Sequence, residues 1–596
     1  MSFRKKSRAL ADSMRARLDV GQRFMVLCVV VGLLCGLVAV AFHLSIHWLF
    51  GEVWHLAESL SLPGFIAVML LAPTLGGLIV GLGVRFISPN AAGSGIPQTK
   101  AAYFNNGGRI SAHDGFWRFI FGVLYVGLGN SLGREGPTVH VSAAIGSRIG
   151  RWGFRDAQRR QAMVPVGVAG GIAAAFNAPI AAIMFVFEEL MDGFSMKALG
   201  GIAVAVVIAA ATSRMILGEN PIVNTHLSVD YHTSLWMLVA MPLGIAAGLV
   251  GTAFTAAIVG LRGWVKDRKA LPEWIRPAIG GLMVGCFGLA GWYFSGLLGY
   301  HSPDVFSVGY DSLEMAFEAK LAVGILLVLL VLKALAVIVN YATGGSGGLF
   351  SPTLFLGGMI GGIMGFGLAG FNEMLPIPDY PGDQEVIGGC VLLGMGALFG
   401  AVIRNPLTSL IMIFEMTGNY SLILPIMGGN LIAWGIASRL QRTPIYNALL
   451  MQDGISLKEM PAYRGAQDYA QLPIAAIMTY DVETLSEQAT VSQVRTGLRQ
   501  KKLAKHAYPV VNEEGHLRGI VTRGELQLAV PETRISEMIA DQELMSFTPK
   551  TSIRDAANKL IAREFQQAPV VSEVDPKRLV GVITLNDITR QQNAVG

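Results

Sequence analysis

Long apolar stretches recur along the chain up to about Leu450, separated by short polar segments. Residues 24–50 and 65–84 contain no Asp, Glu, Lys or Arg. Each is at least as long as the ~20 residues that an α-helix needs to cross the hydrocarbon core of a membrane. Comparable stretches lie around 165–187, 199–213, 235–261, 278–300, 321–340 and 386–403. This pattern predicts a polytopic membrane protein whose spans are α-helices.

Composition and charge support this prediction. The 596 residues are 52% hydrophobic and 15% charged, against roughly 25% charged in soluble proteins. The 72 glycines indicate close helix packing and interrupted helices. The net charge of +5 comes partly from a basic tail, residues 1–20, which runs into an apolar stretch too long for a signal peptide. We therefore expect this tail to stay in the cytoplasm, and we expect no nucleic-acid partner.

The cysteines give no sign of a metal site. Cys28, Cys35, Cys286 and Cys390 all lie in apolar runs without the paired spacing of metal ligands. We expect them to be small packing residues, and we expect neither a metal nor a required cofactor. No nucleophile with a base and an orienting group is visible, so the sequence predicts no enzyme.

The segment Gly133-Arg134-Glu135-Gly136-Pro137 places two charges and two glycines in an otherwise apolar region. An ionisable side chain at membrane depth is costly, so Glu135 is a candidate functional residue. Gly and Pro interrupt a helix, and an interrupted helix leaves backbone N–H groups free to point at an anion. An ordinary turn between two spans is the alternative interpretation.

The two halves of the apolar region are related in sequence. Residues 167–188 align without a gap on residues 394–415, and the Gly, Pro, Phe and Glu anchors all differ by 227 positions, as 394 minus 167 does. Upstream of each copy stands a Gly-x-x-x-Pro element, 133–137 in the first half and 348–352 in the second. Corresponding interruptions in two halves point to a transport site where the repeats meet. A chance match between Ala- and Gly-rich segments is the alternative.

A third glycine-rich element, Gly93-Ser94-Gly95-Ile96-Pro97, supplies a hydroxyl and free amides between apolar spans. Taken alone, Gly-Ser-Gly is also typical of a flexible linker. In this order, Gly-Ser-Gly-Ile-Pro, Gly-Arg-Glu-Gly-Pro and Gly-Gly-Leu-Phe-Ser-Pro resemble the CLC family of chloride channels and proton/chloride exchangers, in its bacterial form, over roughly residues 20–450. The resemblance implies that the three loops converge on helix ends that coordinate chloride near the membrane centre.

The resemblance also implies roles for single residues. Glu135 matches the gating glutamate, whose carboxylate competes with chloride for the same partial positive charges and leaves when it is protonated or displaced. Ser94 matches the hydroxyl that faces the central anion, and Tyr446 matches the phenol that meets it from the inner side. Leu349 and Phe350 match the positions that offer backbone N–H groups. The implied chloride-binding set is Ser94, Gly95, Ile96, Arg134, Glu135, Gly136, Leu349, Phe350 and Tyr446.

A second carboxylate distinguishes exchangers from channels in this family. In Phe187-Glu188-Glu189-Leu190, Glu189 matches the inner glutamate of proton-coupled members, which channel members typically replace with an apolar residue. The resemblance therefore implies that Glu189 transfers protons; a solvated residue at a helix end is the alternative. Glu188 repeats as Glu415, so we expect it to cap or pair at a helix end. Arg404 is expected to satisfy carbonyls or a carboxylate.

After about Leu450 the charges become frequent, and a smaller repeat follows a linker. Residues 508–522 match residues 568–584, each with Pro-Val-Val, a turn and then Gly-apolar-apolar-Thr before a short helix. The two copies resemble a pair of CBS domains, which form adenine-nucleotide clefts in many transporters.

The second copy keeps the ribose-binding pattern of such domains. Thr584 and Asp587 match it, whereas the first copy has Glu525 in place of the aspartate. We therefore expect an adenine nucleotide at the second cleft more readily than at the first. A purely structural pair that holds a dimer together is the alternative.

These patterns together predict the architecture. The fold class is an all-α polytopic membrane domain built of two repeated halves with broken helices, followed by an α/β cytoplasmic CBS pair. The predicted boundaries are 1–20 for the basic tail, 21–452 for the membrane domain, 453–470 for the linker, 471–530 for the first CBS domain and 531–596 for the second.

The predicted function is coupled exchange of chloride and protons through a glutamate gate. We expect a homodimer in the inner membrane of a cell, with both termini in the cytoplasm and chloride, protons and lipid as partners. A passive chloride channel gated by voltage or pH is the alternative on the same fold. A CBS-bearing divalent-cation transporter would need acidic clusters along a cation path, and the apolar spans hold too few acids for one.

Overall fold

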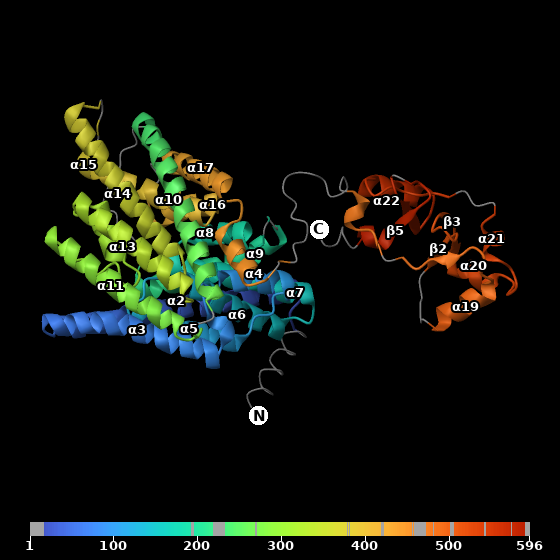
Figure 1. Cartoon of the computed structure of the whole chain (residues 1–596), viewed down its shortest axis with the longest axis horizontal. Helices are drawn as coiled ribbons and strands as arrows, with labels where there is room; N and C mark the ends of the chain where they lie inside the picture. The colour runs from blue at the N-terminus through green and yellow to red at the C-terminus, as the bar shows by residue number, and fades with distance from the viewer. Residues whose placement is uncertain are drawn as a thin grey trace. The chain divides into compact units, whose positions relative to one another are not determined.

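The computed structural model describes residues 17–191, 193, 196–218, 233–268, 271–377, 380, 382–418, 422–455, 457, 473–480, 482–500, 506–540, 544–573 and 575–589. The chain forms two compact units, Met1–Met460 and Pro461–Gly596 (Figure 1). Most of the basic tail predicted at 1–20 and most of the linker predicted at 453–470 lie outside the described residues.

The first unit is helical and has the length and composition of a membrane domain. Within the described ranges, nine helices are long and apolar enough to cross a membrane, so the chain is an integral membrane protein. Large apolar side chains such as Leu71 and Leu327 remain exposed on these helices, as expected of surfaces that contact lipid. The elements are α2 Val20–Glu58, α3 Leu62–Phe86, η1 Pro89–Ala91, α4 Ile96–Asn105, α5 Ala112–Gly127, α6 Glu135–Gly153, α7 Ala157–Phe176, α8 Pro179–Phe185, the π-helical turn η2 Val186–Leu190, α9 Met196–Leu217, α10 Thr233–Asp267, α11 Arg276–Leu297, α12 Tyr310–Phe317, α13 Val323–Ala342, α14 Phe350–Met374, α15 Asp383–Val402, α16 Pro406–Thr417, α17 Ile423–Leu440 and α18 Ile445–Gln452.

The helices repeat in the same order in the two halves of this unit. Helices α6 to α9 of the first half correspond to α14 to α17 of the second, and their packing repeats with them. Helix α2 packs on α7 and α9, just as α10 packs on α15 and α17. Related helices also meet directly, because α3 contacts α11 and α8 contacts α16 (Figure 1). The repeat in the sequence is therefore a repeat in the structure.

The broken helices occur at the predicted motifs, since α6 and α14 each begin inside a Gly-x-x-x-Pro element. The apolar stretch 165–187 is not a single span, however. The chain leaves α7 at Asn177, whose φ of 53° is left-handed, and restarts as α8 at Pro179. Arg404, at the related position before α16, has a φ of 68°. Proline suits the first position of each restarted helix because it needs no acceptor and has a helical φ.

Three of the four cysteines pack inside the membrane unit, as predicted. Cys28, Cys35 and Cys390 are buried, whereas Cys286 is exposed on α11. The predicted packing role is wrong for Cys286, because its side chain is exposed on the surface of this unit.

The second unit contains two copies of one α/β motif, as the smaller repeat predicts. In each copy an antiparallel strand pair carries the Pro-Val-Val and Gly-apolar-apolar-Thr segments. The elements are η4 Ile474–Ala476, β1 Leu485–Ser486, α19 Val491–Gln500, β2 Ala507–Val511, β3 Leu517–Thr522, α20 Arg523–Leu528, α21 Ile535–Met538, α22 Ile553–Ala562, β4 Gln567–Val571 and β5 Leu579–Thr584.

The two copies are joined by hydrogen bonds from their strands. Leu517 N–H donates to Lys577 O at 2.7 Å, and Gln567 Nε2 donates to Ala507 O at 3.0 Å. The copies therefore form one body with clefts at their interface.

Candidate anion and proton site

The two Gly-x-x-x-Pro elements of the repeat are joined by a pair of backbone hydrogen bonds. Gly133 N–H donates to Gly348 O at 2.8 Å, and Gly348 N–H donates to Gly133 O at 2.6 Å. This bridge holds the amino ends of α6 and α14 together, where the first N–H groups of each helix lack intrahelical acceptors. Two helix ends with partial positive charge therefore meet at one place.

The third loop, residues 93–97, packs on the same place. A Cβ atom at Gly136 would approach Ser94 Oγ to 2.5 Å, so only glycine fits there. A Cβ atom at Gly348 would likewise approach Gly136 N to 2.6 Å. The three glycine-rich loops are thus in close contact, and the glycines are needed for that contact.

Two buried hydroxyl groups lie close to each other at this place, and neither has another hydrogen-bond partner in the described part of the chain. They are Ser94 Oγ and Tyr446 Oη, on side chains that are 0% and 1% exposed. Tyr446 also lies close enough to Glu135 and Glu189 to interact with both electrostatically. Buried polar groups normally have hydrogen-bond partners, so the unused hydrogen-bonding capacity of these two hydroxyls indicates a ligand that accepts hydrogen bonds. An anion is such a ligand, and these residues fit chloride as a substrate.

The backbone N–H groups of the predicted set differ in their availability. Gly95 N–H donates to Gln98 Oε1 at 3.1 Å, so this amide is already satisfied. Ile96, Gly136 and Phe350 lie in the first turns of α4, α6 and α14, where an α-helix supplies no acceptor for their N–H groups. Leu349 is the N-cap residue of α14, at the same helix end.

Arg134 is the N-cap residue of α6, and its side chain is directed at protein groups. The guanidinium donates to Ala175 O at 3.1 Å and lies 5.7 Å from the centre of the Tyr310 ring. Arg134 therefore borders the site through its charge and holds the end of α7 beside it.

Glu135 is buried, and its carboxylate lies at the amino end of α14. It accepts hydrogen bonds from Ser351 Oγ, from Ser351 N–H at 3.4 Å and from Tyr310 Oη at 3.5 Å. The carboxylate thereby uses the partial positive charge that a bound anion would use. An ionised Glu135 and an anion at this helix end would exclude each other.

Ser351 and Tyr310 were not predicted from the sequence. Tyr310 Oη lies 2.8 Å from Ser351 Oγ, so the two hydroxyls form one network around the Glu135 carboxylate. A hydroxyl beside Pro352 in an apolar motif was an available signal for Ser351. For Tyr310 there was none, since its contact with α14 depends on how α12 packs.

Glu189 lies in the π-helical turn η2 and pairs with a buried lysine. Glu189 Oε1 is 3.0 Å from Lys100 Nζ, and Asn405 Nδ2 donates to Glu189 Oε2 at 3.3 Å. The side chains of Lys100 and Glu189 are 8% and 5% exposed, so Glu189 is not a solvated residue at a helix end. Lys100 was not predicted, although its place three positions after the Gly-Ser-Gly-Ile-Pro motif was an available signal.

Glu188 and Glu415 each cap a helix in the opposite half of the repeat, and the repetition of this glutamate in the sequence predicted a capping role. Glu188 accepts the N–H groups of Leu407 and Thr408 at the start of α16, at 3.2 and 2.8 Å. Glu415 accepts the N–H groups of Ile180 and Ala181 at the start of α8, at 2.9 and 2.8 Å. Both carboxylates are therefore structural caps, and Glu189 is left as the second candidate for proton transfer.

Arg404 satisfies backbone carbonyls, as predicted. Its guanidinium donates to Ala437 O at 2.9 Å, to Arg442 O at 3.2 Å and to Gln441 O. These carbonyls end α17 and lead to α18, which carries Tyr446. Arg404 therefore helps to fix the start of the helix that carries Tyr446.

Comparison with known proteins shows which family this architecture represents. Residues 76–438, more than half of the chain, match the family model described as voltage gated chloride channel. The chain belongs to this family. Residues 474–532 and 535–593 each match the CBS domain.

This CLC chain is similar to proton-coupled transporters. It is 30% identical over 444 residues to the H(+)/Cl(-) exchange transporter ClcA of Salmonella arizonae. The aligned region covers 72% of this chain and 88% of that relative. The structure of a slow cyanobacterial Cl-/H+ antiporter matches with a TM-score of 0.64 and 26% identity, over 72% of this chain and 98% of that one. A eukaryotic CLC transporter matches over 95% of this chain and 98% of its own with a TM-score of 0.63; at 17% identity it shows the fold alone.

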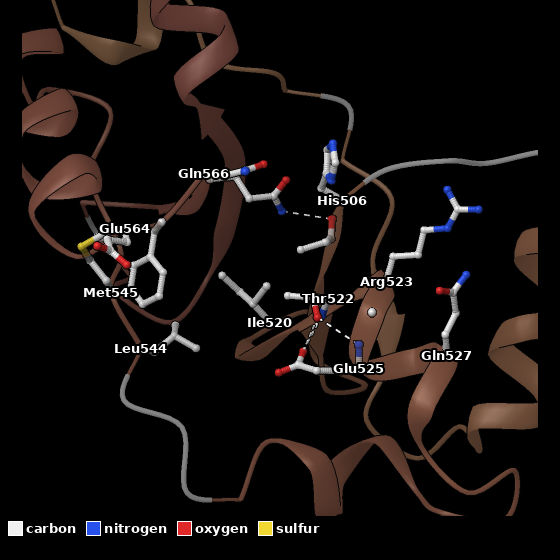
Figure 2. A pocket seen from close by; sticks show the side chains of 14 residues that line it. His506, Ile520, Thr522, Arg523, Glu525, Gln527, Leu544, Met545, Glu564 and Gln566 are labelled. Atoms are coloured by element: carbon white, nitrogen blue, oxygen red, sulfur yellow. Dashed lines mark hydrogen bonds between the residues drawn. The ribbon is translucent and has the colours of Figure 1, made fainter.

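The CBS pair of this CLC chain contains two cavities of the size that small molecules occupy. The larger, about 790 Å³, is lined by both copies, with His506 and Arg523 from the first and Glu564 from the second (Figure 2). The smaller, about 620 Å³, is lined by Thr584 and Asp587, the two residues predicted to bind a nucleotide.

The acidic residues of both CBS copies form the same kind of helix cap. Asp587 Oδ2 accepts from Thr584 N–H at 3.1 Å and from Thr584 Oγ1 at 2.7 Å. Glu525 Oε2 accepts from Thr522 N–H at 2.7 Å and from Thr522 Oγ1 at 2.8 Å (Figure 2). In each case the bonds go to one oxygen, and the other oxygen makes no hydrogen bond within the described residues. Each copy therefore offers a carboxylate oxygen to a ligand.

Proposed function

We propose that this protein exchanges chloride for protons across the membrane. The observation that carries the proposal is a pair of buried carboxylates, Glu135 and Glu189, which both interact electrostatically with Tyr446. A protein that moved only an anion would not need a second buried acid, which is costly at membrane depth. The names of the ClcA relatives support the same activity.

In this mechanism Glu135 is the gate. When ionised, its carboxylate takes the helix-end charges that chloride would use, and Ser351 and Tyr310 hold it there. Protonation removes the negative charge, so chloride can displace the side chain. Because one group both carries the proton and blocks the anion, the two movements are linked.

Glu189 transfers protons between the cytoplasm and Glu135. An anion path lined by backbone amides repels protons, so the proton needs a titratable group outside that path. Lys100 balances the charge of Glu189 and so allows the acid to be buried in its ionised form. Tyr446 interacts electrostatically with both acids, which supports a link between them.

The decisive experiment is a measurement of reversal potential for the purified full-length protein in liposomes under combined chloride and proton gradients. Coupled exchange predicts a reversal potential that shifts with the proton gradient at constant chloride. A passive channel predicts a reversal potential that follows the chloride gradient alone. A reversal potential that follows the chloride gradient alone would contradict coupled exchange and support the passive channel.

We further propose a homodimer in the inner membrane with both termini in the cytoplasm. The basic residues Arg17 and Arg23 at the start of α2 support this orientation, because positive charges favour the cytoplasmic side. Protease access to the termini in intact and inverted membrane vesicles tests the orientation. Light scattering of the detergent-solubilised protein tests the oligomeric state.

We also propose that the smaller CBS cavity binds an adenine nucleotide, with Asp587 Oδ1 accepting from a ribose hydroxyl. Its volume and its free carboxylate oxygen support this. Calorimetry of the full-length protein with ATP and AMP tests it: Asp587→Ala should abolish binding, and Glu525→Ala should have less effect. Absence of binding by the unmodified protein would favour a purely structural CBS pair.

A further inference from the structure

A small cavity between the end of α4 and the start of α7 is lined by arginines without counter-ions. Arg109, Arg151 and Arg160 line it, and its volume is about 140 Å³. None of the three makes an ion pair within the part of the chain that the structure describes. Arg148, which does not line the cavity, and the lining residues Arg109 and Arg160 all lie close enough to Arg151 to repel it electrostatically. Three like charges around one hollow are stabilised when an anion joins them.

The frame of this cavity is fixed by hydrogen bonds rather than by the arginines alone. Ser147 Oγ donates to Gly108 O at 2.7 Å and accepts from Ile110 N–H at 3.0 Å, which fixes the loop after α4 against α6. Arg151 Nη2 donates to Ile110 O at 3.0 Å, so this guanidinium is held in place. Its Nε is shielded from solvent and has no acceptor among the described residues. A buried donor without an acceptor is a second sign that an anion belongs here.

Ordinary positive charges of a membrane-side loop do not explain this arrangement. Arg148, Arg155 and Arg159 are exposed residues of that kind, and they do not line the cavity. The lining arginines instead come from two separate segments, the loop after α4 and the α6–α7 region, and converge on one point.

The cavity lies near the end of α2 at which the chain enters the apolar region. Phe154, in the α6–α7 connection, packs on Phe24 with ring centres 6.1 Å apart, and the Arg23 guanidinium lies 5.3 Å from its ring centre. This end of α2 follows the basic tail, and basic residues at the end of a span favour contact with lipid headgroups.

We propose that this cavity binds a phosphate group. Guanidinium groups match phosphate oxygens in charge and geometry and bind them with paired hydrogen bonds. The volume of about 140 Å³ is below the ~300 Å³ at which cavities enclose larger ligands, so it admits a phosphate but not a nucleoside. The phosphate comes either from the headgroup of an anionic phospholipid or from inorganic phosphate in solution.

The test uses the full-length protein in a neutral detergent at constant chloride, with inorganic phosphate titrated by calorimetry. We expect binding that Arg160→Gln and Arg109→Gln each weaken roughly tenfold or more, because each removes a charge-assisted contact. Arg155→Gln and Arg159→Gln are matched controls that leave binding unchanged. Thermal melting shows that each variant is folded. Phosphate should raise the melting temperature of the unmodified protein and of both control variants. If Arg160→Gln does not fold, Arg109→Gln, at an exposed loop position, decides the result.

Native mass spectrometry with added phosphatidic acid or phosphatidylcholine separates the two sources. Phosphatidic acid adducts that Arg160→Gln removes would assign the site to a lipid headgroup, and phosphate binding without such adducts would assign it to free phosphate. The proposal is overturned if the unmodified protein binds neither, or if Arg155→Gln weakens binding as much as Arg160→Gln.

Discussion

The ammonium of Lys100 lies 3.0 Å from the carboxylate of Glu189, and both side chains are almost fully buried. A buried ion pair adds little net stability, because desolvation of the two charges offsets their attraction. Removal of one partner is costly, however, because the other charge is then buried alone. The pair is thus better explained by a need for a buried titratable acid than by a need for stability.

Lys100→Met should destabilise the membrane unit by about 3–5 kcal/mol at neutral pH, because it leaves the Glu189 charge unbalanced. Lys100→Met with Glu189→Gln should recover most of this loss, since neither charge then remains. Thermal melting of both single variants and the double variant in detergent measures the coupling. Simply additive effects would show that the two side chains do not act as a pair.

Glu189→Gln should stop proton movement while chloride still passes, because the amide cannot carry the proton to Glu135. A pH electrode and a chloride electrode on the same proteoliposomes measure both fluxes. Glu188→Gln is the matched control, since this neighbour caps α16; it should lower folded yield and leave the ratio of protons to chloride unchanged. An unchanged ratio in Glu189→Gln would place the proton route elsewhere.

Glu135→Gln should uncouple chloride transport from proton transport, because the neutral amide mimics the protonated acid and no longer competes with the anion. Chloride flux should continue and become independent of pH, while proton flux should fall to background. Liposome flux at several pH values checks this. Chloride uptake that a pH gradient still drives in this variant would rule out Glu135 as the coupling gate.

Ser351→Ala should speed chloride turnover, because the Glu135 carboxylate loses a hydrogen bond that holds it at the amino end of α14. A hydrogen bond to a charged group contributes about 1.5–3 kcal/mol, so an increase of roughly tenfold or more is expected if release of Glu135 limits the rate. Thr353→Ala is the control, because this hydroxyl of the same helix donates to Leu349 O. Equal rates in Ser351→Ala and the unmodified protein would mean that Ser351 does not hold the gate.

Glu188→Ala and Glu415→Ala should destabilise the protein by similar amounts, about 1 kcal/mol each, because each removes an equivalent helix cap. Neither should change the coupling ratio. Thermal melting compares the two variants directly. A large loss for one and none for the other would show that the caps are equivalent in sequence but not in energy.

The sequence by itself determined the class of protein and most of the helical spans, and it predicted the three loops that meet at the candidate anion site. Spans can be predicted from the sequence because a hydrocarbon core requires about 20 consecutive apolar residues, which is a local property of the chain. The helix interruptions can be predicted because Gly and Pro disrupt a helix at their own positions in the sequence. The repeat added that two such interruptions are equivalent, and the bridge between Gly133 and Gly348 shows that they meet.

Only the tertiary structure decided which polar side chains meet inside the apolar unit. Lys100 and Glu189 are 89 positions apart, and Ser351 and Glu135 are 216 apart. Nothing local links such residues, because each partner is chosen by the packing of several helices. A buried polar group must find a partner within the fold, so a sequence shows that a partner is needed while the packing determines which residue it is.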